Sequence, residues 1–294
     1  MGLLDGRIVI ITGAGRGIGR EHALYMANQG ASVVVNDLGG DLNGVGDQRA
    51  AAQSVVDEIV ASGGKAIGNV DDITTIAGAK NLVELAVETY GDVHALVNNA
   101  GIIRDSMLVT MEEADWDNVI NVHLKGHFCP TQAISQYWRN KSKEQGADSV
   151  KGALVHTTST SGLLGNVGQT NYGAAKAGIA SFSQICAMEL SRYGVRSNAI
   201  APAARTRMTE HTPGFEDMVK APEDPDAFDA WHPANVSPMV AFLVSENCQF
   251  NGETFFVTGG LIQKFIPWAM SDAPGDKLSR DSRWTLEEII SEFS

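Results

Sequence analysis

The stretch Ile8–Arg20, IVIITGAGRGIGR, decides the fold of this 294-residue chain. It begins with an unbroken apolar run, typical of a strand that helices cover on both faces, and continues through a glycine-rich loop into a helical pattern. Gly13, Gly17 and Gly19 let the backbone turn tightly and approach a diphosphate, whose charge the free amides and dipole of the helix stabilise. The spacing G-x-x-x-G-x-G differs from the ordinary dinucleotide fingerprint, so the loop alone also fits a glycine-rich turn without a ligand. The loop residues expected to contact a dinucleotide are Gly13, Arg16, Gly17, Ile18 and Gly19.

Short apolar runs alternate with helical patterns along most of the chain, which is typical of βαβ units and a parallel sheet. We expect strands over Ile8–Ile11, Ala31–Val35, Ala66–Asn69, Ala95–Asn98, Ala153–Thr157, Ser197–Ile200 and Glu253–Val257. We expect helices over Arg20–Asn28, Gln48–Ala61, Ala77–Tyr90, Glu113–Asn140, Gln169–Tyr193 and Ser237–Val244. The sequence therefore predicts a single α/β domain over residues 1–266, with a doubly wound parallel sheet of about seven strands and helices on both faces.

Two polar segments and the C-terminal tail interrupt this alternation. Residues 141–151 are expected to form a surface loop. Residues 211–233 are rich in proline and acids, which is typical of a mobile lid over a cleft, although a solvated linker has the same composition. Residues 267–294 form a C-terminal extension whose last helix is capped by Thr285 and Glu288, and we expect this extension to dock or to contact a second subunit.

Composition and charge exclude several functions. The net charge of −13 disfavours a nucleic-acid partner, because such binding rests on clustered Lys and Arg. The cysteines Cys129, Cys186 and Cys248 are far apart and predict reduced core thiols rather than a disulfide framework or a zinc knuckle. The first apolar run is too short for a secretory signal or a membrane span. We therefore expect a cytoplasmic protein that binds neither nucleic acid nor membrane.

Polar residues after the next strands extend the expected cofactor site. Asp37 ends the second strand, where a carboxylate accepts hydrogen bonds from ribose hydroxyls and repels a 2′-phosphate, so NAD is favoured over NADP. The guanidinium of Arg16 weakens this preference, because it can pair with such a phosphate. Asp72 follows the third strand and can accept from the adenine amino group. The residues after the fourth strand that are expected to pass close to the cofactor are Asn99, Ala100 and Gly101.

Tyr172 and Lys176 stand four positions apart in an expected helix, so they share one face about a turn apart. A tyrosine has a pKa near 10, and about 4 kcal/mol is needed to bring that pKa close to 7. A nearby desolvated ammonium together with the positive charge of a nicotinamide can supply this energy. The pair therefore predicts a phenolate that takes a proton from an alcohol while hydride leaves.

A hydroxyl group that can hydrogen-bond the substrate oxygen lies before this pair, at the end of an expected strand. Ser159 is the candidate. The sequence does not choose between it and its neighbours Thr158, Thr160 and Ser161.

Together these motifs resemble the short-chain dehydrogenase/reductase family over nearly the whole chain. The matching motifs are T-G-x-x-x-G-x-G at Thr12–Gly19, N-N-A-G at Asn98–Gly101, Asn121, Ser159 and Y-x-x-x-K at Tyr172–Lys176. The resemblance implies a Rossmann-type fold, a homodimer or homotetramer, and cofactor contacts that include Pro202, Tyr172 and Lys176. It also implies that Tyr172 is the acid/base, that Lys176 lowers its pKa and binds the nicotinamide ribose, that Ser159 orients the substrate oxygen, and that Asn121 holds a relay water.

The segments VVVNDLGG, NNAGIIRD, GNVGQTNYGAAK and RMTE look like those of the (3R)-hydroxyacyl-CoA dehydrogenase units of multifunctional β-oxidation enzymes. This implies NAD-dependent interconversion of a 3-hydroxyacyl-CoA and a 3-ketoacyl-CoA. Ala203 follows Pro202 where most family members have glycine, and the acidic lid is longer than the resemblance implies. A hydroxysteroid or another bulky alcohol is therefore an alternative substrate. A catalytically silent cofactor-binding or scaffold protein is a further alternative, which the intact set of Tyr172, Lys176 and Ser159 disfavours.

Two other features bear on the choice of function. His123 and His127 have the spacing of zinc-protease ligands, but Leu124 stands where the catalytic glutamate would be, so we expect no metal site. A CoA substrate carries phosphates, so an acidic chain needs local cations at the entrance. The candidate cations are Arg104, Arg205 and Arg207.

Overall fold

The computed structural model describes residues 2–39, 50–206, 219–224, 226–266, 268–271 and 279–293. Their strands form one sheet in the order β3-β2-β1-β4-β5-β6-β7-β8. These strands are β1 (Ile8–Thr12), β2 (Ser32–Asn36), β3 (Lys65–Asn69), β4 (Ala95–Asn98), β5 (Gly152–Thr157), β6 (Val195–Pro202), β7 (Thr254–Thr258) and β8 (Leu261–Lys264). Every pairing among β1 to β7 is parallel, and β8 pairs with β7 in the antiparallel direction. The structure thus confirms the doubly wound α/β fold, with eight strands rather than about seven because the short, exposed edge strand β8 was not predicted.

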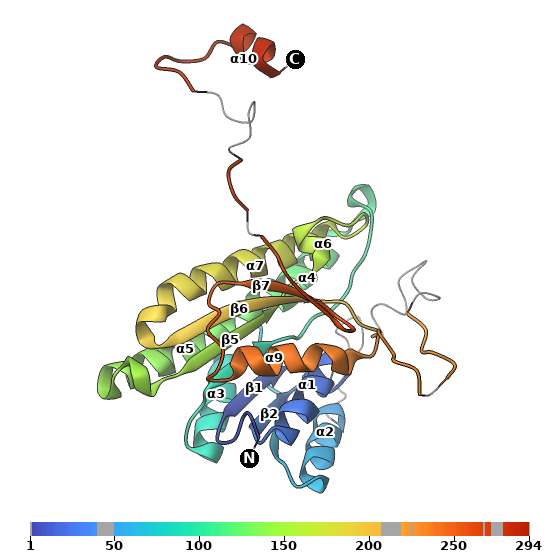
Figure 1. Ribbon diagram of the computed structural model, residues 1–294, viewed down its shortest axis with the longest axis vertical. Helices are drawn as coiled ribbons and strands as arrows, with labels where there is room; N and C mark the ends of the chain where they lie inside the picture. Colours follow the sequence, from blue (N-terminus) through green and yellow to red (C-terminus); the bar gives the residue numbers. More distant parts are fainter. Residues whose placement is uncertain are drawn as a thin grey trace.

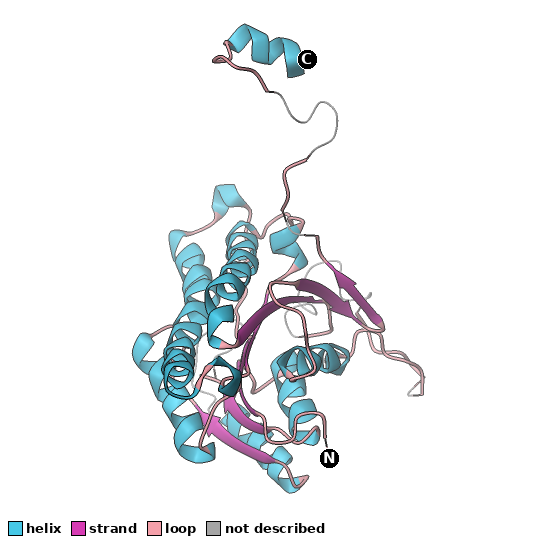
Figure 2. Cartoon of the chain, turned by 60° about the vertical axis from the view of Figure 1, so that its left-hand side comes forward, coloured by secondary structure: helices cyan, strands magenta, loops and turns pink. Residues whose placement is uncertain are grey.

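Helices cover both faces of this sheet (Figures 1 and 2). They are α1 (Gly17–Asn28), α2 (Ala50–Ala61), α3 (Ile76–Tyr90), α4 (Glu113–Ile120), α5 (Gly126–Gln145), α6 (Thr160–Leu163), α7 (Thr170–Leu190), α9 (Ser237–Val244) and α10 (Leu286–Phe293). Helices α1, α2 and α9 pack on one face, and α3, α5 and α7 pack on the other. Within the described ranges, no helix is both long and apolar enough to cross a membrane.

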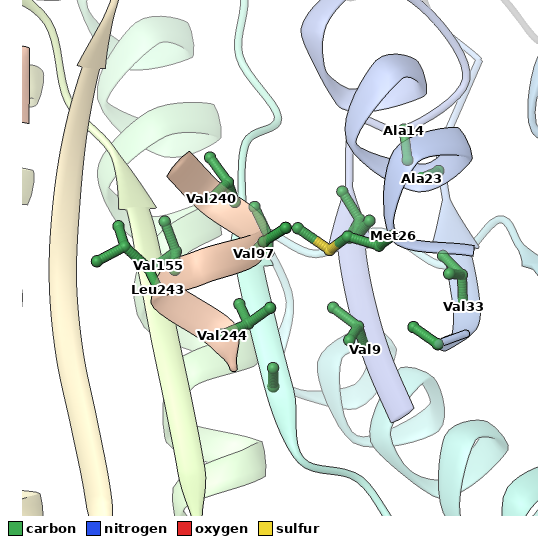
Figure 3. Close-up of a cluster of buried hydrophobic side chains, with 14 of the residues drawn as sticks. Val9, Ala14, Ala23, Met26, Val33, Val97, Val155, Val240, Leu243 and Val244 are labelled. Carbon is green, nitrogen blue, oxygen red and sulfur yellow. The ribbon is translucent and has the colours of Figure 1, made fainter. Parts of the chain in front are cut away.

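The unbroken apolar strands follow from this two-sided cover, because successive side chains of a strand point to opposite faces. Val9 lies in the same buried cluster as Met26 of α1 and Val240 of α9 (Figure 3). Its neighbour Ile10 lies in the cluster on the other face, together with Trp138 of α5. Each such side chain contributes roughly 1.5–3 kcal/mol when it is fully buried.

The three cysteines are part of these clusters. Cys129 and Cys186 lie in the cluster of α3 and α5, and Cys248 lies in the cluster of α1 and α9. All three are buried and free, as the sequence predicted.

The expected helix Glu113–Asn140 is a chain of three segments. After α4 comes a π-helical turn, η2 (Asn121–Lys125), and then α5 continues to Gln145. Residues 141–151 are therefore not the surface loop that was predicted, since their first part belongs to α5. The ammonium of Lys141 pairs with Asp92 before β4, which holds the helix beyond its expected end. A π-helical turn inside a longer helix is frequent at functional sites.

The expected lid over residues 211–233 is described only from residue 219 onward, apart from residue 225, because residues 207–218 lie outside the described part. Arg205, just after β6, holds this second half of the segment. Its guanidinium donates to the carbonyl of Val219 at 2.9 Å and pairs with the carboxylate of Asp229. Its backbone amide donates to the carbonyl of Trp231 at 2.6 Å. That the segment closes over a cleft stays a prediction.

The tail ends in the capped helix that the sequence predicted. The amide of Thr285 donates to Glu288 Oε2 at 2.8 Å, and the amide of Glu288 donates to Thr285 Oγ1 at 3.3 Å. Helix α10 lies away from the sheet and its helices (Figure 1), and it exposes the apolar side chains of Leu286, Ile289 and Ile290. Docking or subunit contact by this extension stays a prediction.

Candidate active site

A cavity of about 810 Å³ opens at the carboxyl ends of the central strands. It lies beside the point where the chain order of the sheet reverses, between β1 and β4. Such a point is where doubly wound sheets bind their ligands. All the site residues expected from the sequence line this one cavity: Gly13, Arg16, Gly17, Ile18, Gly19, Asp37, Asp72, Asn99, Ala100, Gly101, Asn121, Ser159, Tyr172, Lys176 and Pro202.

The glycine loop has a backbone shape that other residues rarely adopt. Gly13 and Gly17 have φ angles of +62° and +54°, in the left-handed region that favours glycine. A Cβ atom at Gly19 would lie 2.2 Å from the carbonyl oxygen of Gly13. The loop leads directly into α1. The first amides of a helix have no partner within the helix, so they can bind a diphosphate. These features fit a dinucleotide.

The loop after β4 is fastened to the glycine loop. The hydroxyl of Thr12 accepts the amides of Asn99 at 3.0 Å and Ala100 at 3.2 Å. The side-chain amide of Asn99 donates to the carbonyls of Thr12 and Gly13, both at 3.1 Å. The side chain of Asn99 thus holds the two loops together, and Thr12 is a site residue that the sequence analysis did not single out, although it belongs to the motif.

Two carboxylates mark the far end of the cavity. Asp37 Oδ2 accepts the amide of Gly15 and Asp37 Oδ1 accepts the amide of Gly39, both at 2.8 Å. Each carboxylate oxygen keeps a lone pair that can accept from a ribose hydroxyl. Asp72 Oδ1 accepts both the amide and the hydroxyl of Thr74 at 2.8 Å. It therefore organises the turn before α3, and its contact with adenine stays a prediction.

The hydroxyls at the end of β5 have different partners, and this separates them. Ser159 Oγ accepts the amide of Ser161 at 3.2 Å, and its hydroxyl also acts on the phenol of Tyr172, whose pKa it lowers. The hydroxyl of Thr158 is buried and donates to the carbonyl of Lys176 at 2.6 Å. Thr160 and Ser161 also line the cavity. Of the four candidates, Ser159 is the one whose contact with Tyr172 the structure records.

The ammonium of Lys176 lies over the ring of Tyr172, with Nζ 5.4 Å from the ring centroid. It donates to the carbonyl of Thr157 at 2.6 Å. Burial lowers the pKa of Lys176 to about 7 and raises the pKa of Tyr172 to about 12, although the hydrogen bond from Ser159 opposes the rise. Burial and Asp105 both raise the pKa of Tyr172, so the expected acidity of the phenol depends on the positive charge of a nicotinamide together with the ammonium of Lys176, and it stays a prediction.

The candidate cations at the entrance are engaged with carboxylates. Arg104 Nε lies 3.4 Å from Asp115 Oδ1, and Arg205 pairs with Asp229. Arg207 lies outside the described residues. Trp231, at the end of the Arg205-bound segment, also lines the cavity.

Comparison with known proteins gives the family. The model for short chain dehydrogenases matches residues 7–217. The chain belongs to the short-chain dehydrogenase family. This short-chain dehydrogenase is 44% identical over 269 residues to the hydroxyacyl-CoA dehydrogenase ChsB1 of Mycobacterium tuberculosis, covering 90% of this chain and 81% of the relative. A crystal structure of a short chain dehydrogenase from Mycobacterium avium has a TM-score of 0.85 and 45% identity, covering 99% of this chain and 95% of that one.

A longer relative matches over part of its length. The peroxisomal multifunctional enzyme type 2 of Mus musculus is 43% identical over 260 residues, covering 88% of this chain but 32% of the enzyme. This short-chain dehydrogenase thus spans about a third of that protein. With its family and these relatives, it is an oxidoreductase that acts on CH–OH groups.

We expect Lys176→Met to remove a pH dependence from the stability of the fold. The pKa of Lys176 is about 7 when folded and 10.5 when exposed, so the unfolded chain binds more protons between these values and wild-type stability rises with pH there. The free-energy cost of burying the charged Lys176 is fully present below pH 7. The variant should exceed the wild type by on the order of 2 kcal/mol at pH 7, and this margin should narrow at pH 9.

Urea unfolding at both pH values measures the margin. Lys151→Met, at an exposed position paired with Glu246, is the control and should change stability by less than about 1 kcal/mol at either pH. A Lys176→Met margin that is the same at pH 7 and pH 9 would contradict an ionisable, buried lysine.

Proposed function

We propose that this protein is an NAD-dependent dehydrogenase that interconverts a 3-hydroxyacyl-CoA and the corresponding 3-ketoacyl-CoA. The observation that carries this proposal is that Tyr172, Ser159 and Lys176 share one cavity with the glycine loop and Asp37. Relatives named hydroxyacyl-CoA dehydrogenase and peroxisomal multifunctional enzyme support an acyl-CoA as the substrate.

NAD is the cofactor that the donor set favours. The backbone of the glycine loop would hold the diphosphate, and the carboxylate of Asp37 would bind the adenine ribose and repel a 2′-phosphate. Arg16 lines the same cavity and can pair with a 2′-phosphate, so the preference for NAD rests on the carboxylate of Asp37. When bound, the nicotinamide supplies the acceptor or donor of hydride.

Tyr172 and Ser159 act on the substrate oxygen. Both side chains line the cavity, and the hydroxyl of Ser159 is close enough to lower the pKa of Tyr172, so one substrate oxygen would contact both. As a phenolate, Tyr172 takes the proton of the alcohol during oxidation, and as a phenol it returns that proton to the ketone oxygen during reduction. Because its pKa is about 12 in the protein, the phenolate needs positive charge nearby. Lys176 and an oxidised nicotinamide both carry positive charge.

Lys176 and Asn121 complete the proposed set. Lys176 keeps one proton on the carbonyl of Thr157, which leaves two others for a ribose hydroxyl and for water. Asn121 starts the π-helical turn and lines the same cavity, where its amide would hold a water. This set of polar contacts disfavours a catalytically silent scaffold.

A hydroxysteroid or another bulky alcohol is the second candidate substrate. The observation that favours it is the size of the cavity, about 810 Å³, together with the apolar side chains of Leu164 and Trp231 in its wall. A rigid apolar substrate would also not need the cations that Arg104 and Arg205 commit to carboxylates.

The test is NADH formation with 3-hydroxyacyl-CoA thioesters of several chain lengths, beside a series of steroid alcohols. We expect turnover of the thioesters and a fall of at least about a thousandfold in Tyr172→Phe, because the general base is lost. Binding of NAD to the variant, followed by quenching of protein fluorescence, should stay within about threefold of the wild type. Turnover of steroids alone would replace the acyl-CoA proposal by the second candidate.

We expect Asp37→Ala to shift cofactor preference toward NADP. The variant removes the charge that repels a 2′-phosphate and the acceptor for ribose hydroxyls, so the ratio of kcat/KM for NAD to that for NADP should fall by roughly tenfold or more. Asp57→Ala, exposed on α2, is the matched control and should leave the ratio unchanged. An unchanged ratio in Asp37→Ala would refute the role of this carboxylate.

We also propose that the chain forms a homodimer or homotetramer. Ile185 and Met188 on α7 are 49% and 75% exposed, and Leu261 and Ile262 on the edge strand β8 are 49% and 55% exposed. Burial of these side chains against a second copy would stabilise an assembly. Light scattering after size-exclusion chromatography should give at least twice the mass of one chain, and Met188→Glu should reduce the assembled fraction. A monomer at micromolar concentration would contradict the proposal.

A further inference from the structure

One of the histidines of the segment HLKGH touches the proposed catalytic tyrosine. His123 lies in η2 and is 1% exposed. Its ring centroid is 5.1 Å from that of Tyr172, and the two ring planes are perpendicular. Edge-to-face contacts of this kind fix the relative orientation of two rings. His123 also lines the cavity.

The imidazole of His123 is anchored on its other side by the loop after β4. Nε2 lies 2.7 Å from the carbonyl oxygen and 3.1 Å from the amide nitrogen of Ile102, and the shorter contact assigns the proton to Nε2, which donates it to the oxygen. Cε1 would lie 2.3 Å from a Cβ atom at Gly101, so the ring fits only because residue 101 has no side chain. His123 therefore links the loop that passes close to the cofactor with the ring of Tyr172.

The second ring nitrogen of His123 is unpaired. Nδ1 is buried and has no hydrogen-bond partner among the described residues. With the proton on Nε2, Nδ1 carries a lone pair that can accept. The ring stays neutral, because burial and the nearby charge of Lys176 lower the pKa of His123 to about 3. A buried acceptor without a partner in the wall of a polar cavity is a place for an ordered water.

Asn121, the other polar residue that η2 places in the cavity wall, lies two positions earlier. Residues two apart on a helix do not share a face, so the two side chains reach different parts of the cavity. The recorded ring contact with Tyr172 and the charge interaction with Lys176 belong to His123. Geometry therefore favours His123 as the residue of this turn that acts on the catalytic pair.

We propose that His123, beside Asn121, is a second residue that η2 contributes to the catalytic centre and the one that positions Tyr172: its ring orients Tyr172, and its Nδ1 accepts a hydrogen bond from the water through which the proton leaves. The proposal rests on the proposed function. In the oxidation direction the hydroxyl proton of the alcohol moves to the phenolate of Tyr172 and hydride moves to the oxidised nicotinamide. The phenol then releases that proton through Lys176 and water to solvent, and His123 gains and loses no proton.

Three variants separate the two residues. His123→Phe keeps a ring against Tyr172 and removes the acceptor, His123→Asn keeps an acceptor and removes the ring, and Asn121→Ala removes the amide. His22→Phe is the matched control, because His22 is a fully buried histidine that pairs with Ser237 outside the cavity. Circular dichroism and thermal unfolding report whether each variant is folded.

The first readout is kcat with a secondary alcohol that the wild type oxidises. We expect kcat to fall roughly tenfold to a hundredfold in both His123 variants, because a small misplacement of the base has this effect, with KM for NAD within about threefold. His22→Phe should lose less than about threefold, and Asn121→Ala should lose less than either His123 variant. An Asn121→Ala loss as large as that of His123→Phe, or normal kcat in His123→Phe, would overturn the proposal.

The second readout needs no substrate. Absorbance of tyrosinate, measured as wild type minus Tyr172→Phe in the presence of NAD, follows the titration of Tyr172 itself. The groups that face His123 are Tyr172 and Lys176 from α7 and His127 from α5, and Asp105 also acts on Tyr172.

We expect the titration midpoint of Tyr172 to move in His123→Phe and to stay in place in Asn121→Ala. The reference for each variant is the same variant with Tyr172→Phe added. If the wild type oxidises no alcohol, the proposed function fails while this titration still decides the role of His123. An unmoved midpoint in His123→Phe would refute that role. For a His123→Phe that does not fold, the same criterion applies to His123→Asn.

Discussion

The active site depends on two loops that pack backbone against backbone with no side chain between them. A Cβ atom at Gly13 would lie 2.6 Å from the Cα of Ala100, and one at Gly19 would lie 2.2 Å from the carbonyl of Gly13. The hydroxyl of Thr12 and the amide of Asn99 then fix this spacing. Because β1 and β4 are neighbours in the sheet, the contact forms the floor of the cavity. It also sets how far the dinucleotide loop lies from the reactive hydroxyls on β5 and α7.

The sequence predicts most of the fold because burial on two faces leaves a strong pattern. Runs such as Ile8–Ile11 and Ala95–Asn98 are apolar without a break, and the structure places strands there. The pattern is weakest where burial is weak. The strand Leu261–Lys264 is exposed along its whole length, so it was missed. The π-helical turn at Asn121–Lys125 was also missed, because a single extra residue in a helix does not change its apolar period.

The site was predictable as a set of residues but not in its electrostatics. Motif spacing gathers every expected residue around one cavity, since the carboxyl ends of parallel strands meet at one edge. Only the structure distinguishes Ser159 from Thr158 as the residue beside Tyr172. The two side chains carry the same hydroxyl group and differ only in the direction in which they point. The pKa of Tyr172 could not be predicted from the sequence, because burial of the phenol raises it while the ammonium of Lys176 and the charge of a nicotinamide would lower it. Contacts such as that of His123 depend on helix phase, which sequence patterns do not resolve.

Arg205 has a consequence for how this protein tolerates change. Its three bonds tie the end of β6 to Val219, Asp229 and Trp231, so a single residue beside the sheet holds three points of the segment that ends in the cavity wall. A substitution of Val219 would leave the bonds of Arg205 to Asp229 and Trp231 in place, whereas a substitution of Arg205 would release Val219 and Asp229 together. Robustness to mutation is therefore uneven along this wall, and it is lowest at the residue on which the contacts converge.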